Sequence, residues 1–347
     1  GLYYSRVCIC KTCSVHNMLK QLSKILIFIF VIPSYCFGQE TDLGPGYQMI
    51  MMNNPAFSGS EGDGVLRLSY LNFYPGNNYN LHSVYFSYDS YFPALHGGAG
   101  FYLSDDYLGG IINDLRGGLS YSYFLQAGKD LFINAGLSAS VYHRGYNFEN
   151  AILPEQIEFG RVTETLATKG QTVFDIGAGF LFISGKYFGG FSINHLAEPD
   201  LTATGSSNER LKRKLLLHLA GELNLSKTQN LKVRPLGFLG LQGGFLSASA
   251  QGFLSAGAGA VLESNYLSVN AIMLGEKMLG DNGKNINIQT GFSFKSGKVS
   301  VYYNYRFNII SENKLLPLSL LHQTGIAFSL NYIDKKNLIK TINFPEL

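Results

Sequence analysis

Residues 285–308 read NINIQTGFSFKSGKVSVYYNYRFN, and this stretch decides the fold class. Apolar residues or threonine occupy every second position from Ile286 to Phe294, and small or polar residues stand between them. After a turn at 296–298, the same alternation runs from Val299 to Phe307. A period of two residues predicts two β-strands, each with one apolar and one polar face. A soluble sandwich buries the apolar face, whereas a transmembrane barrel turns it toward lipid.

The spacing of similar stretches along the chain favours the barrel. Tight connections follow every second candidate strand, and longer ones, including 143–172, 195–212 and 309–321, follow the others. An even number of strands with loops sorted in this way is typical of an outer-membrane barrel with both termini in the periplasm. We therefore predict an all-β fold, a transmembrane antiparallel outer-membrane β-barrel of about 14 strands. The candidate strands are 65–73, 80–90, 97–104, 115–126, 130–142, 173–184, 186–194, 213–225, 230–240, 251–263, 265–274, 285–295, 298–308 and 322–333.

The composition agrees with an all-β membrane protein. The 347 residues include 40 Gly, 22 Tyr and 25 Phe but no Trp, and only 15% of them are charged. No run of about 18 apolar residues occurs after residue 38, so membrane-spanning helices are not expected. Four of the 27 basic residues precede residue 39, which leaves 23 basic against 24 acidic residues. This balance argues against nucleic acid as a partner.

The N-terminal region has the pattern of a secretory signal peptide. We assign residues 18–38 to it, with an apolar run at 25–32 and cleavage near Gly38/Gln39. Residues 1–17 do not fit a signal peptide, and we interpret them as a non-native upstream extension. All 4 cysteines precede the cleavage site, so no disulfide or thiolate site is expected in the mature chain. The rest divides into an N-terminal periplasmic or plug-like segment at 39–64, the barrel at 65–333 and a C-terminal periplasmic tail at 334–347.

The alternation also predicts which side chains face lipid and which face the lumen. Several large side chains fall on the inward parity, so we expect a partly filled lumen and do not assume an open pore. The residues expected to face lipid include Phe292, Tyr303 and Phe328, and those expected to face the lumen include Gln289, Asn304 and Ser329. The large inward side chains are Tyr85, Phe132, Tyr142, Tyr302 and Arg306.

Two stretches carry a resemblance to a known family. Residues 47–60 read YQMIMMNNPAFSGS, and 174–199 read FDIGAGFLFISGKYFGGFSINHLAEP. The first is similar to the tyrosine-methionine segment and NPAxxGS motif of the PorP/SprF family of type IX secretion outer-membrane proteins. The second resembles that family's GxSxxHL strand end, here formed by Gly190, Ser192, His195 and Leu196. The resemblance covers about 40–333.

The resemblance implies a non-enzymatic outer-membrane component of type IX protein secretion, in the bacterial outer membrane. Its expected partners are outer-membrane lipid, periplasmic type IX secretion components, and a cognate secreted surface adhesin linked to gliding motility. No cofactor is implied. The alternative function is a small-molecule outer-membrane porin or transporter, which requires an open polar lumen. The residues predicted to dock partners are Asn54, Pro55, Ala56, Phe57, Gly59, Ser60 and His195.

Each candidate site also has a structural interpretation. Pro55 biases Asn54 toward an extended conformation, so the motif can be a turn that leads the chain into the wall. His195 ends a strand where a long loop starts, which favours a capping role. His218 and Glu222 share one face of a strand, and a hydrogen-bonded pair in the lumen is favoured over catalysis. Asp105 and Asp106 offer too few oxygens for a Ca²⁺ site. We therefore predict no catalytic, cofactor or metal site.

Overall fold

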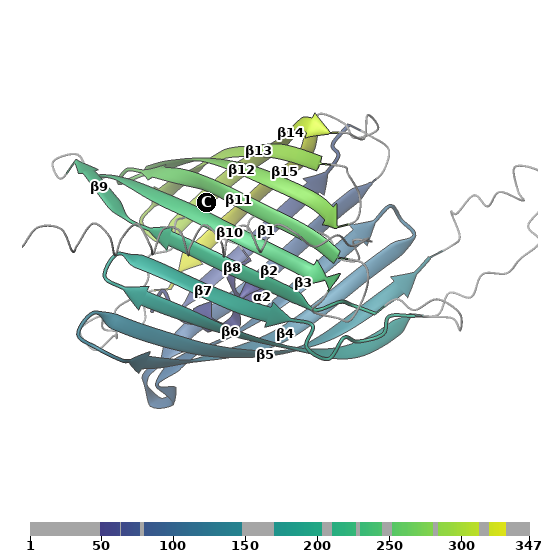
Figure 1. Ribbon diagram of the computed structural model, residues 1–347, viewed down its shortest axis with the longest axis horizontal. Helices are drawn as coiled ribbons and strands as arrows, with labels where there is room; N and C mark the ends of the chain where they lie inside the picture. Colours follow the sequence, from purple (N-terminus) through teal and green to yellow (C-terminus); the bar gives the residue numbers. More distant parts are fainter. Residues whose placement is uncertain are drawn as a thin grey trace, which may run out of the picture.

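The described residues form one antiparallel sheet that closes on itself (Figure 1). A computed structural model describes residues 49–62, 64–76, 80–147, 170–202, 210–226, 230–244, 252–279, 284–311 and 319–330. The 1–17 extension, the signal peptide, its cleavage site, the 334–347 tail and most of the 143–172 loop lie outside these residues.

Strands account for most of the described chain, and short helical turns are few. The helical elements are α2 (Ile50–Asn53), η1 (Pro55–Phe57) and η2 (Pro93–Leu95). The strands are β1 (Val65–Phe73), β2 (Leu81–Phe92), β3 (Gly97–Leu108), β4 (Ile112–Gln126), β5 (Leu131–Tyr146), β6 (Gln171–Ser184), β7 (Tyr187–Asn194), β8 (Lys214–Gly221), β9 (Leu223–Ser226), β10 (Leu231–Gly243), β11 (Gly252–Glu263), β12 (Leu267–Leu279), β13 (Lys284–Ser296), β14 (Val299–Ser311) and β15 (Ser319–Ser329). Among the described residues, no helix has the length and hydropathy needed to cross a membrane.

The first and last strands complete the barrel wall. Val65 of β1 lies opposite Ser329 of β15, so these two strands pair along their length. β8 and β9 both pair with β10 and are separated by Glu222 alone, so together they form one interrupted strand of the wall. Counted in this way, the 15 described strands fill 14 positions around a closed barrel, as predicted. Closure leaves no unpaired strand edge, which a membrane span requires.

The interruption at Glu222 corrects the prediction of one continuous strand at 213–225. Pro235 of β10 faces this break, because pairing with β9 ends at Val233 and pairing with β8 resumes at Leu236. Proline has no backbone N–H to donate to a neighbouring strand. The ladder is therefore interrupted at Arg234 and Pro235, and the proline cannot complete it.

Strands β3 and β4 also differ from the prediction, because each is longer than its expected range. The ladder continues through Asp106 opposite Asp114 to Leu108 opposite Ile112. The connection at 109–111 is therefore a three-residue turn, in which Gly109 and Gly110 have positive φ angles. The expected long connection after the third strand is wrong. At the same end of the barrel as the β3–β4 turn, other connections are long, such as 147–170 between β5 and β6.

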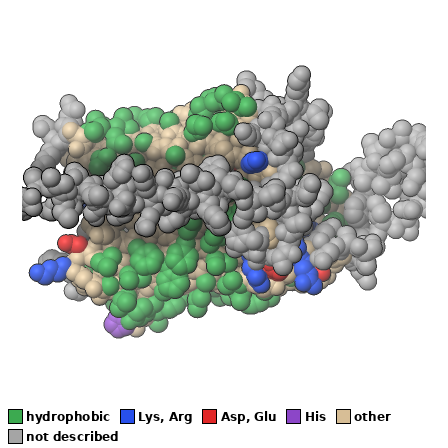
Figure 2. Space-filling view, viewed as in Figure 1, with side chains coloured by type: hydrophobic (Ala, Val, Ile, Leu, Met, Phe, Trp, Pro, Cys, Tyr) green, Lys and Arg blue, Asp and Glu red, His purple; other side chains and the backbone are tan. Residues whose placement is uncertain are grey.

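Side-chain burial follows the predicted parity. Phe292 and Phe328 are exposed on the outer face, whereas Gln289 and Asn304 are each 1% exposed. The large inward side chains from Tyr85 to Arg306 named above are all buried. Figure 2 shows hydrophobic side chains over the middle of the visible barrel face, with charged side chains toward its two ends. This banding is typical of a barrel that spans a membrane.

Candidate functional site

A segment N-terminal to β1 occupies the lumen of the barrel. We call residues 49–62 the plug; it contains α2 and η1, and Figure 1 shows α2 within the outline of the barrel. Asn54, Ala56 and Ser58 are each 0% exposed. The plug therefore lies inside the barrel, ahead of the point where the chain enters the wall at Val65.

The Asn54-Pro55 pair sets the shape of the plug. Asn54 is extended, with φ −148° and ψ 110°, because the ring of a following proline excludes the helical conformation. Its side-chain oxygen accepts a hydrogen bond from the Ala56 N–H at 2.9 Å and so caps η1. Its amide nitrogen donates to the carbonyl oxygens of Phe180 and Phe191, at 3.3 and 3.4 Å. The Asn54 side chain thus both stabilises η1 and holds the plug against β6 and β7.

Polar side chains of the wall satisfy the backbone carbonyls of the plug. Ser122 donates to the carbonyl oxygen of Ala56 at 3.0 Å, and Ser192 donates to that of Asn53 at 2.5 Å. Asn194 also donates to the Asn53 carbonyl, at 3.2 Å. Buried backbone groups without partners are costly, so these donors make burial of an irregular segment possible.

Inward-facing glycines make room for the plug. A Cβ atom at Gly136 would overlap the backbone nitrogen of Ala56, and one at Gly98 would overlap the carbonyl oxygen of Ser58. At Gly179 it would overlap the side-chain oxygen of Asn54. The wall and the plug are therefore complementary in shape at three separate strands.

A buried ion pair holds the end of the plug that leads to β1. Arg67 of β1 forms ion pairs with Asp89 of β2 and with Glu61 of the plug. Asp89 also accepts a hydrogen bond from the backbone N–H of Gly59 at 2.7 Å. Breaking such a pair leaves a buried charge without its partner, so this end of the plug is firmly anchored.

An apolar contact holds the opposite side of the plug. The ring of Phe57 packs edge-on against Phe188 and lies 5.0 Å from the ring of His218. Glu222 instead pairs with Lys186 at 3.2 Å and with other cations near the break in the wall. The predicted hydrogen bond between His218 and Glu222 is therefore wrong, because residues four apart on an extended strand are about 13 Å apart.

His195 belongs to a second buried charged cluster. Its Nδ1 lies 2.8 Å from Asp175 Oδ2, and Arg116 donates to the same oxygen at 3.3 Å. His195 is 0% exposed and has a left-handed backbone, with φ 57°, where β7 gives way to the following loop. This geometry agrees with the capping interpretation. Asp175 and Arg116 were not found from the sequence, although both fall on the inward parity of their strands.

The aspartates at 105 and 106 lie within β3, on opposite faces of the strand. Asp106 is buried and Asp105 is exposed, so they cannot bind one ion together. Among the described residues, no group of three or more His, Cys, Asp and Glu side chains could hold a metal ion.

All seven residues predicted to dock partners are buried in this structure. Six of them lie in the plug, and His195 lies at the end of the β7 strand that the plug contacts. Their contacts are internal, with the barrel wall. A direct role for these residues in docking stays a prediction.

Comparison with protein-family models identifies the chain. The model described as type IX secretion system membrane protein PorP/SprF matches residues 47–316, which is most of the chain. The protein belongs to the PorP/SprF family. The matched region begins with the plug and extends through 14 of the described strands. Comparison with curated proteins finds no match.

Solved structures support the fold of this PorP/SprF protein. A deletion mutant of the TodX monoaromatic hydrocarbon channel aligns with TM-score 0.51 at 12% identity, over 86% of this chain and 96% of that one. Pseudomonas putida TodX, a toluene transporter, aligns with TM-score 0.47 at 12% identity, over 85% and 93%. Acinetobacter baumannii Omp33 aligns with TM-score 0.41 at 10% identity, over 78% and 100%. At such identities, the first alignment shows a shared outer-membrane barrel fold and nothing about substrates.

In this PorP/SprF barrel, the two stretches that carried the family resemblance contact each other. Ser192 of the second stretch donates to the Asn53 carbonyl in the first. Asn54 of the first donates to the Phe191 carbonyl in the second. The resemblance therefore marks an internal interface between the plug and the wall.

Proposed function

We propose that this protein is a docking component of type IX secretion in the outer membrane, and that it does not act as a diffusion channel. The observation that carries the proposal is the plug. Residues 49–62 occupy the lumen as packed, hydrogen-bonded chain, anchored on one side by Arg67 and on the other by Phe57. A small-molecule porin, the alternative function, needs a continuous polar lumen instead.

Docking then takes place at the ends of the barrel. The expected partners are periplasmic type IX secretion components or a cognate surface adhesin. Among the described residues, the turn around η2 exposes apolar side chains at the end of the barrel with the short turns, with Phe92 40% and Leu95 50% exposed. The 143–172 loop and the 334–347 tail complete the proposed docking surfaces. The plug stabilises the barrel beneath these surfaces, because it contacts several strands at once.

Site-specific photocrosslinking in intact outer membranes tests this proposal. A photoreactive phenylalanine analogue at Phe92 should capture a partner protein. The same analogue at Phe57, inside the lumen, and at Phe174, which is exposed on the outer wall, should capture none. Capture at Phe57 with none at Phe92 would instead support direct docking by the buried motif, as the sequence predicted. Absence of any partner, together with solute conductance of the purified barrel, would favour the porin.

A further inference from the structure

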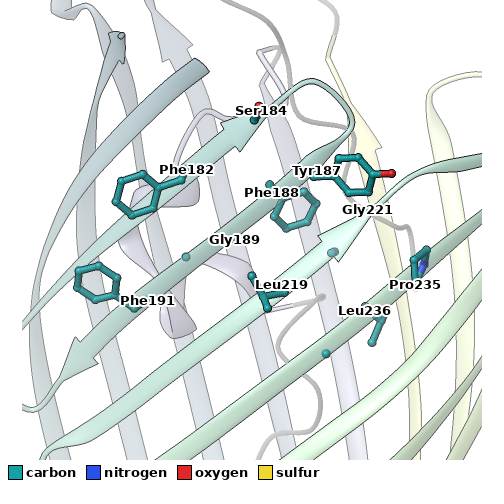
Figure 3. Close-up of a pocket in the computed structure, with 13 residues that line it drawn as sticks. Phe182, Ser184, Tyr187, Phe188, Gly189, Phe191, Leu219, Gly221, Pro235 and Leu236 are labelled. Carbon is teal, nitrogen blue, oxygen red and sulfur yellow. The ribbon is translucent and has the colours of Figure 1, made fainter. Parts of the chain in front are cut away.

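The outer wall of the barrel carries an apolar groove across β6, β7, β8 and β10. Its volume is about 830 Å³, which falls within the range of small-molecule sites. Figure 3 shows Leu219 standing between Phe182 and Phe191 on one side and Pro235 on the other. We call this feature the wall groove.

Small outward residues create the wall groove. Gly189 of β7 and Gly237 of β10 both lie opposite Leu219 of β8, and Gly221 is the next outward position of β8. The leucine is 70% exposed because neither neighbour has a side chain to pack beside it. The break in the ladder at Glu222 and Pro235 lies at the same place.

The groove opens where the barrel faces lipid. The outward neighbours on these strands, including Phe182, Leu217 and Leu239, are exposed hydrophobic side chains. Tyr187 lies at the end of the groove beside the tight turn at Gly185, and it is 58% exposed. Exposed tyrosines near barrel turns typically lie at the level of the lipid headgroups.

A cluster of charged side chains lies at that same end of the barrel wall. The Lys186 ammonium group is 3.2 Å from Glu222, and Lys232 is 3.4 Å from the other oxygen of the same carboxylate. Arg234 pairs with Glu222 and with Glu263. Glu222, Lys232 and Arg234 fall on the lumen-facing parity of their strands, so the cation of this cluster that lies within reach of the outer face is Lys186, in the β6–β7 turn. The side chain of Lys186 is 49% exposed, so an additional anion can reach it.

We infer that the wall groove binds one anionic phospholipid, with an acyl chain over the glycines and the phosphate group at Lys186. The apolar floor suits the acyl chain, the exposed tyrosine marks the interface, and the exposed ammonium group of Lys186 suits the phosphate. This inference does not depend on the proposed docking function.

Fluorescence quenching by lipids with brominated acyl chains tests the inference. The protein has no tryptophan, so Tyr187→Trp introduces a single reporter beside the groove. Tyr266→Trp is the matched control, because Tyr266 is exposed beside the tight β11–β12 turn. Its backbone carbonyl oxygen accepts a hydrogen bond from the Lys295 N–H, which does not involve the substituted side chain. In phosphatidylcholine vesicles, brominated phosphatidylglycerol should quench the first reporter with an apparent preference of about fivefold over brominated phosphatidylcholine. The control reporter should follow the bulk lipid composition.

Variants of the groove test the acyl-chain site and the headgroup site separately. Gly237→Leu should fill the groove and abolish the preference; a Cβ atom there meets nothing closer than 3.6 Å, so the fold tolerates it. Gly275→Leu, at an outward position of β12 with its nearest atom at 3.9 Å, should leave the preference unchanged. Lys186→Gln should lower the preference, whereas Lys129→Gln, in the β4–β5 turn, should not.

A second measurement leaves the groove unaltered. Native mass spectrometry of the unchanged barrel with phosphatidylglycerol should show one retained lipid, which Gly237→Leu removes. Equal quenching of the two reporters, or lipid retention that Gly237→Leu leaves intact, would overturn the inference. Retention of a polypeptide in place of lipid would show that the groove serves a protein partner instead.

Discussion

The hydroxyl group of Ser192 in β7 donates a 2.5 Å hydrogen bond to the backbone carbonyl of Asn53 in the plug. These two residues are 139 positions apart in the chain, yet each belongs to a stretch that resembles the PorP/SprF family. The contact shows that the conspicuous N-terminal motif is fitted into the barrel and is not displayed outside it. The account of this protein as a plugged docking barrel depends on that interface.

Enlarging a glycine beneath the plug should expel it. Gly136→Val places a side chain where the backbone of Ala56 now lies, which should destabilise the plugged state by about 1–3 kcal/mol. The barrel should still fold, because the strand ladder is unchanged. Limited proteolysis should then cleave within 49–62. The control is Gly275→Val, at an open position of β12. A protected plug in Gly136→Val would contradict the observed packing.

Asn54 tests the hydrogen bonds between plug and wall. Asn54→Ala loses the η1 cap and both donors to the wall, and should weaken plug docking by about 1–3 kcal/mol. Asn54→Asp keeps the capping oxygen but loses the donors, and it places a carboxylate near the carbonyls of Phe180 and Phe191. The aspartate variant should therefore be no better than alanine when protease sensitivity of the plug is measured. Protection at the wild-type level in Asn54→Asp would mean that the cap alone matters.

The buried cluster at Asp175 should be sensitive to loss of charge. Asp175→Asn leaves Arg116 and His195 without their shared carboxylate, and breaking a buried pair of this kind costs about 3–5 kcal/mol. The unfolding midpoint of the refolded barrel in urea should fall accordingly. The double variant Arg116→Met with Asp175→Leu should recover part of the loss, because no buried charge from this pair then lacks its partner. A midpoint in Asp175→Asn equal to wild type would show that the cluster is not energetically coupled.

A charged side chain on the outward face should destabilise the barrel. Phe292→Arg places a cation in lipid and should cost up to about 2–4 kcal/mol, less if the site lies near the interface. Phe292→Leu should be nearly neutral. From the sequence alone, Gln289→Arg on the inward face should cost far less free energy than Phe292→Arg. The structure argues against this expectation. Arg306 donates to Gln289 at 3.4 Å, so a second arginine would face a buried like charge. Heat-dependent gel migration of the refolded barrels measures these effects, and equal migration of Phe292→Arg and Phe292→Leu would contradict the assignment.

The alternation of side chains was sufficient to predict the strands and their faces. Phe292 and Gln289 lie on the predicted sides because a strand has a period of two residues whatever its neighbours are. The sequence could not show that 49–62 lies in the lumen, because that depends on contacts with strands far along the chain. A signal was nevertheless present, because Gly98, Gly136 and Gly179 all fall on the inward parity. A barrel whose lumen is filled by its own wall would need larger side chains at these positions. The cluster of Arg116, Asp175 and His195 was hidden for a similar reason, since only the register of the wall brings it together.

The most direct test of the central claim is secretion of a type IX cargo by a barrel whose plug cannot leave. The hydroxyl groups of Ser58 in the plug and Ser120 in β4 are 2.7 Å apart, so Ser58→Cys with Ser120→Cys should form a disulfide in the oxidising periplasm. In a strain that lacks the protein, cargo secretion should be lost, and both the wild-type and the locked barrel should restore it equally. Normal secretion in the deletion strain would contradict a role in type IX secretion. Restoration by the locked barrel only after a reductant is added would show that the plug must move, which contradicts a permanently plugged docking barrel.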